Sequence, residues 1–209
     1  MPMLQKIVYF EKPGRENTRE IAELVKERAK ELGIHTILVA TRTGKTALEV
    51  AEVFLNEDIK IIGVAHSYGN SKQGKWLVKE EFSEKLKQMK VSVVTSIQPF
   101  GSFARLFHPE KKPGLYPLYL STFPLDVMAD TLRLFCQGMK VCVEIALMVA
   151  DMGLIPMDRE IIAIAGTQRG ADTAVVMRPA HTSSLFNLRI REIIAKPRAE
   201  RTEQPPLED

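Results

Sequence analysis

The stretch VATRTGKTALEV, Val39–Val50, decides the fold class, because an apolar strand pattern runs through a short polar turn directly into a helix pattern. The same succession recurs on both sides of it. Strand patterns at 6–10, 36–40, 59–65 and 91–95 alternate with helix patterns at about 17–32, 43–55 and 78–89. Buried strands that alternate with amphipathic helices are typical of parallel sheets covered on both faces. We therefore predict a three-layer αβα fold.

The alternation of strand and helix patterns ends after Thr95. A segment rich in proline and aromatic residues, 97–123, precedes an apolar helix pattern at about 124–152. Strand patterns at 160–165, 173–178 and 188–195 are then expected to add antiparallel C-terminal strands to a mostly parallel sheet. No linker divides the chain, so we predict a single α/β domain over 1–195, with 97–155 as an elaboration and 196–209 as a loosely ordered tail.

The bulk composition excludes several classes of function. The 209 residues include 29 basic and 26 acidic side chains, a net charge of +3, which does not indicate broad nucleic-acid binding. Cys136 and Cys142 lie in an apolar stretch without disulfide or metal spacing, and the histidines are not spaced as metal ligands either, so no metal is expected. With no secretory signal, and with an apolar run at 141–150 that is too short for a span, we expect a cytoplasmic protein with no membrane or nucleic-acid partner.

Gly44-Lys45-Thr46 invites comparison with the phosphate-binding loop of nucleotide hydrolases. That loop requires the pattern Gly-x4-Gly-Lys-Ser/Thr, which would place its first glycine at position 39. Val39 stands there instead, inside the apolar strand pattern. The sequence also lacks a Gly-x-Gly-x-x-Gly turn after any strand, so neither nucleotide-binding fingerprint is present.

A second pattern, Ala65-His66-Ser67-Tyr68-Gly69, differs from a nucleophile elbow only in its first residue. Asp172 and His181 follow in the chain order of a catalytic triad. An elbow enters a helix directly after its serine, however, and here a glycine-bearing loop follows at 69–74. A small serine hydrolase using Ser67 stays open as an alternative, beside the simpler interpretation that Ser67 forms hydrogen bonds at a strand end.

The turn Thr41–Thr46 has the chemistry of a phosphate site. It offers three hydroxyls, a glycine that permits close backbone approach, and the positive charges of Arg42 and Lys45. Because it precedes a helix, free N–H groups and the helix dipole add to the attraction for an anion. A plain helix N-cap explains the same residues equally well.

These residues also carry a resemblance to a known family. Thr41–Ala47, Thr-x-Thr-Gly-Lys-Thr-Ala, resembles the phosphate-binding turn of the pyruvate kinase C-terminal domain. Gly166–Arg178 is similar to that domain's effector loop and the strand after it, and Ile61–Ala65 to its third strand. The resemblance implies a strand order of 3-2-1-4-5, which we count here from the strand at 6–10.

The resemblance also implies limits on function. A domain that fills 209 residues leaves no room for a catalytic barrel, so the chain is not expected to be a pyruvate kinase by itself. It looks like the stand-alone archaeal type of the family, uncharacterised proteins associated with bound flavin mononucleotide (FMN). The resemblance therefore implies FMN as the cofactor, although no residue is identifiable as a redox partner. A non-catalytic sensor of a phosphorylated metabolite is the alternative.

Ligands of open parallel sheets bind at the carboxyl ends of the strands. We expect the phosphate at Thr41–Thr46 and the flat ring of the ligand beside His66–Gly69 and Phe103. The aromatic segment 97–123 is equally well explained as a homo-oligomer interface. The predicted binding residues come from five segments of the chain: Glu11, Asn17, Thr18; Thr41, Arg42, Thr43, Gly44, Lys45, Thr46; His66, Ser67, Tyr68, Gly69; Phe103; and Gly166, Thr167, Arg169, Gly170, Asp172, Thr173.

Overall fold

The computed structural model describes residues 4–70, 73–102 and 124–198, and its centre is a seven-stranded sheet. The strand order is β1-β7-β6-β5-β2-β3-β4. The strands are β1 (Val8–Phe10), β2 (Thr36–Ala40), β3 (Lys60–Ala65), β4 (Ser92–Thr95), β5 (Ile161–Ala165), β6 (Thr173–Arg178) and β7 (Arg189–Pro197). The tail therefore begins later than predicted, because β7 extends to Pro197 and the N–H of Arg198 donates to the carbonyl of Phe10.

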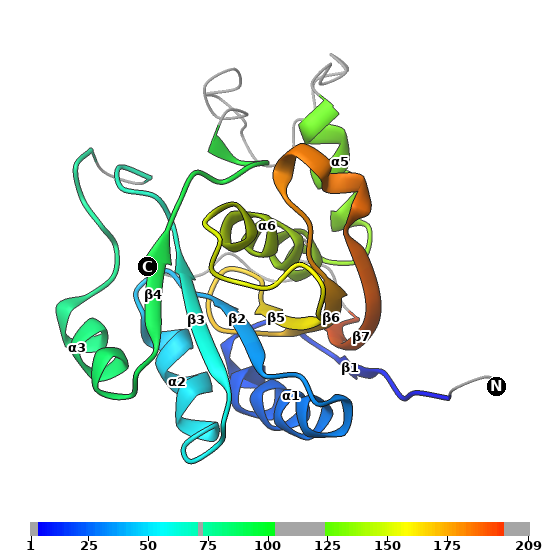
Figure 1. Ribbon diagram of the computed structural model, residues 1–209, viewed down its shortest axis with the longest axis horizontal. Helices are drawn as coiled ribbons and strands as arrows, with labels where there is room; N and C mark the ends of the chain where they lie inside the picture. The colour runs from blue at the N-terminus through cyan, green and yellow to red at the C-terminus, as the bar shows by residue number, and fades with distance from the viewer. Residues whose placement is uncertain (1–3, 71–72, 103–123, 199–209) are drawn as a thin grey trace.

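Helices cover both faces of this sheet, as predicted (Figure 1). On one face lie α1 (Thr18–Leu32), preceded by the short helix η1 (Arg15–Asn17), α2 (Lys45–Val53) and α3 (Glu80–Gln88). On the other lie α5 (Pro124–Arg133) and α6 (Gln137–Asp151), with a short helix η2 (Thr182–Asn187) between β6 and β7. No helix in the described ranges combines the length and apolarity that crossing a bilayer requires.

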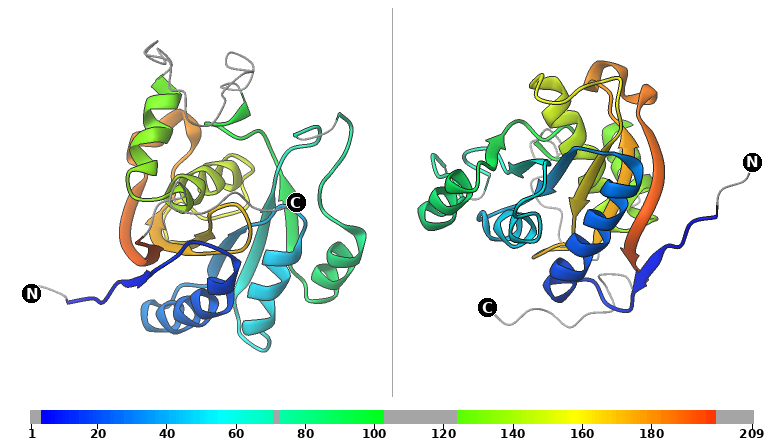
Figure 2. Two further views of the ribbon diagram at one scale, coloured as in Figure 1. Left: turned by 180° about the vertical axis from the view of Figure 1, so that it is seen from behind. Right: turned by 60° about the horizontal axis from the view of Figure 1, so that its bottom comes forward.

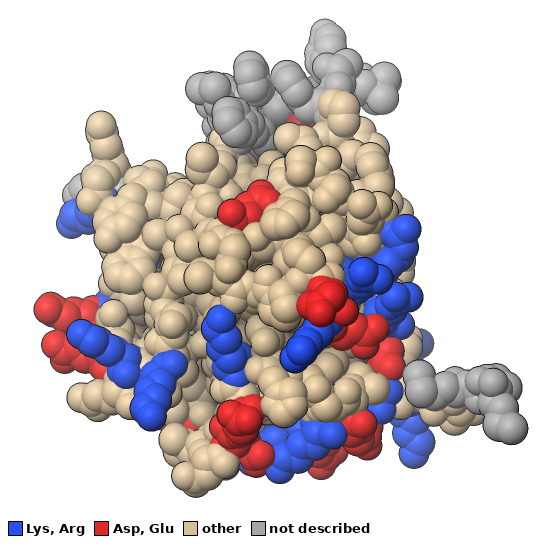
Figure 3. Space-filling model, in the orientation of Figure 1, with Lys and Arg blue, Asp and Glu red and all other residues tan. Residues whose placement is uncertain are grey.

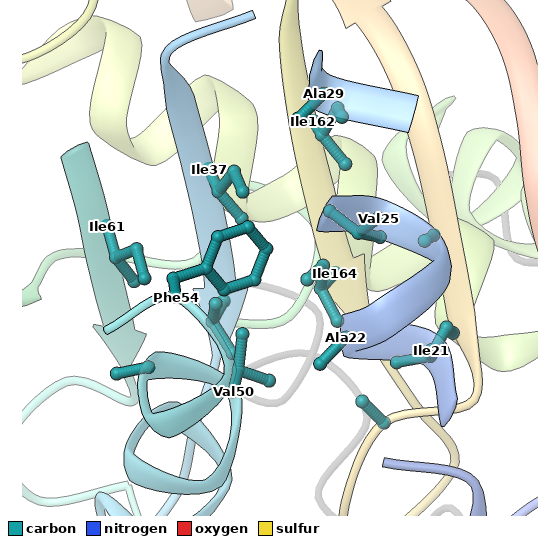
Figure 4. Close-up of a cluster of buried hydrophobic side chains, with 14 of the residues drawn as sticks. Ile21, Ala22, Val25, Ala29, Ile37, Val50, Phe54, Ile61, Ile162 and Ile164 are labelled. Carbon is teal, nitrogen blue, oxygen red and sulfur yellow. The ribbon is translucent and has the colours of Figure 1, made fainter. Parts of the chain in front are cut away.

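The larger core fills the space between the sheet and α1 and α2 (Figure 4). The apolar residues of α1 recur at helical spacing, and Ile21, Val25 and Ala29 are therefore buried together. Phe54, which ends α2, lies among Ile37 of β2 and Ile61 of β3. Since β2 and β5 contribute alternate residues to both faces, β5 is apolar throughout and β2 is apolar after Thr36, as expected for a doubly covered sheet.

The helix predicted over 124–152 is two helices, so that prediction is wrong in its continuity. α5 ends at Arg133, and α6 begins at Gln137 after a break. The Sγ atom of Cys136 accepts a hydrogen bond from the N–H of Met139 at 3.4 Å, and thereby caps α6. Gly138 then lets α6 approach β6 closely, because a Cβ atom there would lie 2.1 Å from the Oγ1 atom of Thr173.

The predicted strand order is wrong when it is counted from the strand at 6–10. β1 lies at the outer edge of the sheet beside β7, far from β2 and β3 (Figure 2). When the count begins at β2 instead, the run β4-β3-β2-β5-β6 has the order 3-2-1-4-5. β1 is thus an addition to the edge of that five-stranded unit, and its short apolar pattern did not reveal this.

Only β6, among the strands described, runs against all the others. The pairs β5–β6 and β6–β7 are antiparallel, as predicted for the C-terminal strands, whereas β7 and β1 are parallel. The carboxyl end of β6 therefore lies at one end of the sheet, and the carboxyl ends of its neighbours β5 and β7 lie at the other.

A paired arginine joins α1 to the C-terminal strand. The guanidinium of Arg28 donates two hydrogen bonds of 2.8 Å to the carboxylate of Glu192 in β7. The two side chains are only 10% and 13% exposed, and the bond to Glu192 raises the pKa of Arg28 above its ordinary range. This bidentate pair fixes the position of α1 over the edge of the sheet.

We expect Arg28→Met to lower the free energy of unfolding by about 2–3 kcal/mol, because it leaves the carboxylate of Glu192 without its partner in a partly buried place. Arg28→Met combined with Glu192→Leu should recover most of the loss. Urea denaturation measures both effects. Arg133→Met, at an ion pair whose side chains are 39% and 41% exposed, is the control and should change stability by less than about 1 kcal/mol. Equal losses in both single variants would contradict the assignment.

Candidate functional site

Four loops meet at one end of the sheet, at the carboxyl ends of β2, β3, β4 and β5. This end is called an edge below. The strand register places Val39 beside Ile164, Ala40 beside Val64, and Ala65 beside Thr95. The loops that follow these residues begin with Thr41, Gly166, His66 and Ser96. The loop after β5 therefore lies directly beside the turn after β2.

The turn Thr41–Thr46 is held from within by backbone and hydroxyl groups. Thr41 is only 6% exposed, and its N–H donates to the carbonyl of Val64 at 2.9 Å. Its hydroxyl accepts a hydrogen bond from the N–H of Gly44 at 3.1 Å. The carbonyl of Thr43 accepts from the N–H of Lys79 at 3.0 Å. Thr41 thus shapes the turn, while Arg42 is exposed and Thr43 half-buried.

The first turn of α2 has open N–H groups. The intrahelical bonds begin with the N–H of Leu48, which donates to the carbonyl of Gly44 at 3.0 Å. Within the described ranges, the N–H groups of Lys45, Thr46 and Ala47 have no acceptor, and no side chain caps the helix. Unpaired N–H groups at a helix N-terminus attract anions, and the dipole adds to the effect. Lys45 and Thr46 are half-buried beside them.

Gly44 has a different role from the one expected. Its φ of 95° is in the left-handed region, and a Cβ atom there would lie 2.8 Å from the Cβ atom of Phe82 in α3. The glycine is therefore required for α3 to pack against the turn, and this contact, rather than the approach of a ligand, occupies its open side. The sequence could not reveal this contact, because Phe82 is distant in the chain.

The loop after β5 is organised around the buried carboxylate of Asp172. Its two oxygens accept hydrogen bonds from the N–H of Thr167 at 2.8 Å and from the hydroxyl of Thr173 at 2.7 Å. Burial raises the pKa of Asp172 above its ordinary value, and these hydrogen bonds oppose that shift. Asp172 and Thr173 have no exposed surface, so they stabilise the loop through buried hydrogen bonds and do not face solvent.

The loop between β1 and α1 packs against the loop after β5. The hydroxyl of Thr18 donates to the carbonyl of Arg15 at 2.6 Å and accepts from the N–H of Ala171 at 3.0 Å. Gly170, with a φ of 76°, lies so close that a Cβ atom would be 2.4 Å from the Cα atom of Arg15. Thr18 and Thr167 are accordingly buried, whereas Arg169 is exposed at the rim.

The remaining predicted residues of the first segment contribute less to this edge. The side-chain amide of Asn17 donates to the carbonyl of Lys12 at 2.8 Å and does not cap α1. Glu11 is exposed. Arg15, which the sequence did not single out, forms an ion pair of 2.6 Å with Glu49 of α2 and so connects this segment to the helix that follows the turn Thr41–Thr46.

The loop after β3 carries an exposed aromatic surface. The ring of Tyr68 is 60% exposed and stacks on Trp76, with centroids 5.7 Å apart and an interplanar angle of 11°. The imidazole of His66 lies 2.7 Å from the side-chain amide of Gln98, which joins the loops after β3 and β4. Ser67 is half-buried and Gly69 exposed. Phe103 lies outside the described residues, as does most of the segment 97–123.

The triad expected for a serine hydrolase is not assembled. Ser67 follows β3, and a turn rather than a helix comes after it, because α3 begins only at Glu80. His181 follows the antiparallel strand β6 and therefore lies at the opposite edge of the sheet, 3.3 Å from the carboxylate of Asp151. Asp172 is engaged with Thr167 and Thr173. Ser67, Asp172 and His181 therefore do not form a triad.

A buried ion pair near this edge was not predicted from the sequence. The ammonium of Lys140 lies 2.5 Å from the carboxylate of Glu144, one helical turn away, and both side chains are at most 7% exposed. The other oxygen of Glu144 accepts from the N–H of Phe100 at 3.0 Å, in the loop after β4. Two opposite charges at this spacing in an otherwise apolar helix were the available signal. The pair fixes the loop after β4 on α6.

This chain is similar to known proteins, both by a family model and by solved structures. Residues 19–177 match the family model described as pyruvate kinase, alpha/beta domain. A crystal structure of a pyruvate kinase from Cryptosporidium parvum is similar at 16% identity, with a TM-score of 0.40, and covers 78% of this chain and 23% of its own. The ADP complex of Cryptosporidium parvum pyruvate kinase has 16% identity and a TM-score of 0.37, covering 76% and 22%. This chain thus spans less than a quarter of the length of those proteins.

We expect Asp172→Ala to lower the free energy of unfolding by about 3 kcal/mol, because buried N–H groups lose their acceptor at a cost of about 1–3 kcal/mol each. Chemical denaturation monitored by circular dichroism measures the loss. Asp158→Ala, at an exposed carboxylate, is the matched control and should have little effect. If both variants lose the same stability, Asp172 does not organise the loop.

Proposed function

The chain belongs to the pyruvate kinase α/β domain family, and on that premise we propose that it binds a phosphate ester, FMN, at the turn Thr41–Thr46. The proposal includes no reaction. Flavin chemistry belongs to the cofactor, and the protein contributes binding and orientation.

The observation that carries the proposal is the open first turn of α2. The N–H groups of Lys45, Thr46 and Ala47 point out of the helix without acceptors among the described residues. A phosphate dianion would accept from them and meet the hydroxyls of Thr43 and Thr46 together with the charges of Arg42 and Lys45. Since the hydroxyl oxygen of Thr41 already accepts from Gly44, the turn needs no rearrangement to present these groups.

The rest of the ligand would extend toward the loop after β3, which is next to the turn in the sheet order. There, the exposed ring of Tyr68 rests on Trp76 and offers a flat apolar surface. An isoalloxazine ring fits such a surface, because aromatic groups stack with offset faces. The same phosphate contacts suit a phosphorylated metabolite without a ring. A non-catalytic sensor of such a metabolite is therefore the second candidate, and it is favoured because the groups of the turn would contact only the phosphate.

The titration of FMN fluorescence with the protein tests the first proposal. We expect quenching in the wild type, and weaker binding by about 1.5–3 kcal/mol in Thr43→Ala/Lys45→Ala, since charge-assisted contacts to the phosphate are removed. Lys87→Ala, which removes an exposed charge from α3, is the control and should bind as the wild type does. A wild type that does not quench FMN fluorescence would refute the flavin proposal.

Thermal unfolding separates the second candidate from the first. A sensor of a phosphorylated metabolite predicts a larger rise in Tm with a sugar phosphate such as fructose 1,6-bisphosphate than with FMN, because a ligand that binds the native state stabilises it. Riboflavin, which lacks the phosphate, is the matched ligand control and should raise Tm less than FMN does. The sensor proposal is to be abandoned if no phosphorylated compound shifts Tm.

A further inference from the structure

A second concave surface lies at the opposite edge of the sheet, where β6 ends and β7 begins. It is a groove of about 450 Å³ between these strands, the short helix η2 and the segment before β5, which is a volume typical of small-molecule sites. Lys and Arg side chains gather over β7 in the space-filling view (Figure 3). The polar side chains that line the groove are Arg178, His181, Ser184, Asn187, Arg189 and Arg191.

Two of these arginines are neighbours on adjacent strands of the sheet. Arg178, the last residue of β6, is the direct partner of Arg189, the first residue of β7. Side chains of directly opposed residues lie on the same face, and like charges in such a pair destabilise a sheet. Arg191 is the extra residue of a bulge, since Ile190 pairs with Met177 and Glu192 with Val176. A bulge re-aims the side chain it carries, and here that side chain is a third arginine.

The protein holds the two opposed guanidinium groups through backbone carbonyls alone. The Nε atom of Arg178 donates to the carbonyl of Met157 at 3.4 Å, and the Nη1 atom of Arg189 donates to the carbonyls of Phe186 and Leu188. In the described part of the chain, neither group forms an ion pair. The two terminal nitrogens of Arg178 and the Nε–Nη2 side of Arg189 therefore remain available as forks, the geometry that binds phosphate in a bidentate manner.

Two carboxylates near the groove contact groups other than Arg178 and Arg189. Glu160 lies 3.2 Å from the guanidinium of Arg191, and Asp151 lies 3.3 Å from the imidazole of His181. Neither carboxylate pairs with Arg178 or Arg189, so no ion pair within the described residues occupies their guanidinium groups. A phosphate monoester carries a charge of about −2 at neutral pH, which matches this pair.

We propose that this groove is a second anion site, in which Arg178 and Arg189 together bind a phosphate dianion, either the free ion or a monoester, and thereby remove their mutual repulsion. Ser184 and Asn187 supply uncharged hydrogen-bonding groups at its wall. The site is independent of the turn Thr41–Thr46, because the reversed direction of β6 places it at the other edge of the sheet.

Isothermal titration at low ionic strength tests the proposal, with glycerol 3-phosphate and inorganic phosphate as the two probes. The parent protein carries Thr43→Ala/Lys45→Ala, which weakens binding at the turn Thr41–Thr46, and the arginine variants are compared within this parent, so that failure of the FMN proposal does not affect the result. Arg178→Gln and Arg189→Gln, each in this parent, should weaken binding of the better probe at least tenfold. Arg178→Lys should recover only part of the affinity, because it keeps the charge and loses the fork.

Arg159→Gln, at an exposed arginine close to the groove in sequence, is the matched control and should bind as the parent does. Tighter binding of glycerol 3-phosphate than of inorganic phosphate identifies an ester as the ligand, and the reverse identifies the free ion; both support the site. A parent that binds neither probe overturns the proposal. It is equally overturned if Arg159→Gln weakens binding as much as Arg178→Gln, since the effect would then be one of general surface charge. Circular dichroism spectra and Tm values confirm that each variant is folded.

Discussion

The hydrogen bonds of one buried carboxylate organise the loop at the carboxyl end of β5. Asp172 accepts from Thr167 and Thr173, and so it joins the loop after β5 to the start of β6. Through Thr173, the same cluster touches the cap of α6, where the Sγ atom of Cys136 lies 3.3 Å from the threonine hydroxyl. A carboxylate without exposed surface is tolerated only because each of its oxygens is used.

Because the single strand β6 is reversed, the open N–H groups of α2 and the arginines of the groove lie at opposite ends of the sheet. The parallel strands β2, β3, β4 and β5 deliver their loops to one edge, where backbone N–H groups at the start of α2 are open. β6 runs back and delivers Arg178 to the other edge, beside the start of β7. The same reversal separates His181 from Ser67, which is why the residues of an apparent catalytic triad never meet.

The two edges differ in how they would attract a phosphate. At the turn Thr41–Thr46, the attraction comes mainly from oriented N–H groups and the helix dipole, which are fixed by the backbone and need little side-chain ordering. In the groove beside β7, it comes from the full charges of Arg178 and Arg189, oriented by backbone carbonyls. The first arrangement suits a specific terminal phosphate, whereas the second depends more strongly on ionic strength.

The sequence by itself determined the layers, the elements of the sheet and the exclusion of a nucleotide-hydrolase loop, because buried strands are continuous apolar runs and Val39 occupies one of them. It did not determine the edge position of β1, the break between α5 and α6, or the contact of Gly44 with Phe82. Local patterns report which face of an element is buried. They do not report which distant segment covers it, and only the tertiary structure decided that Asp172 turns inward and that Arg178 meets Arg189, since both depend on strand pairing across long stretches of chain.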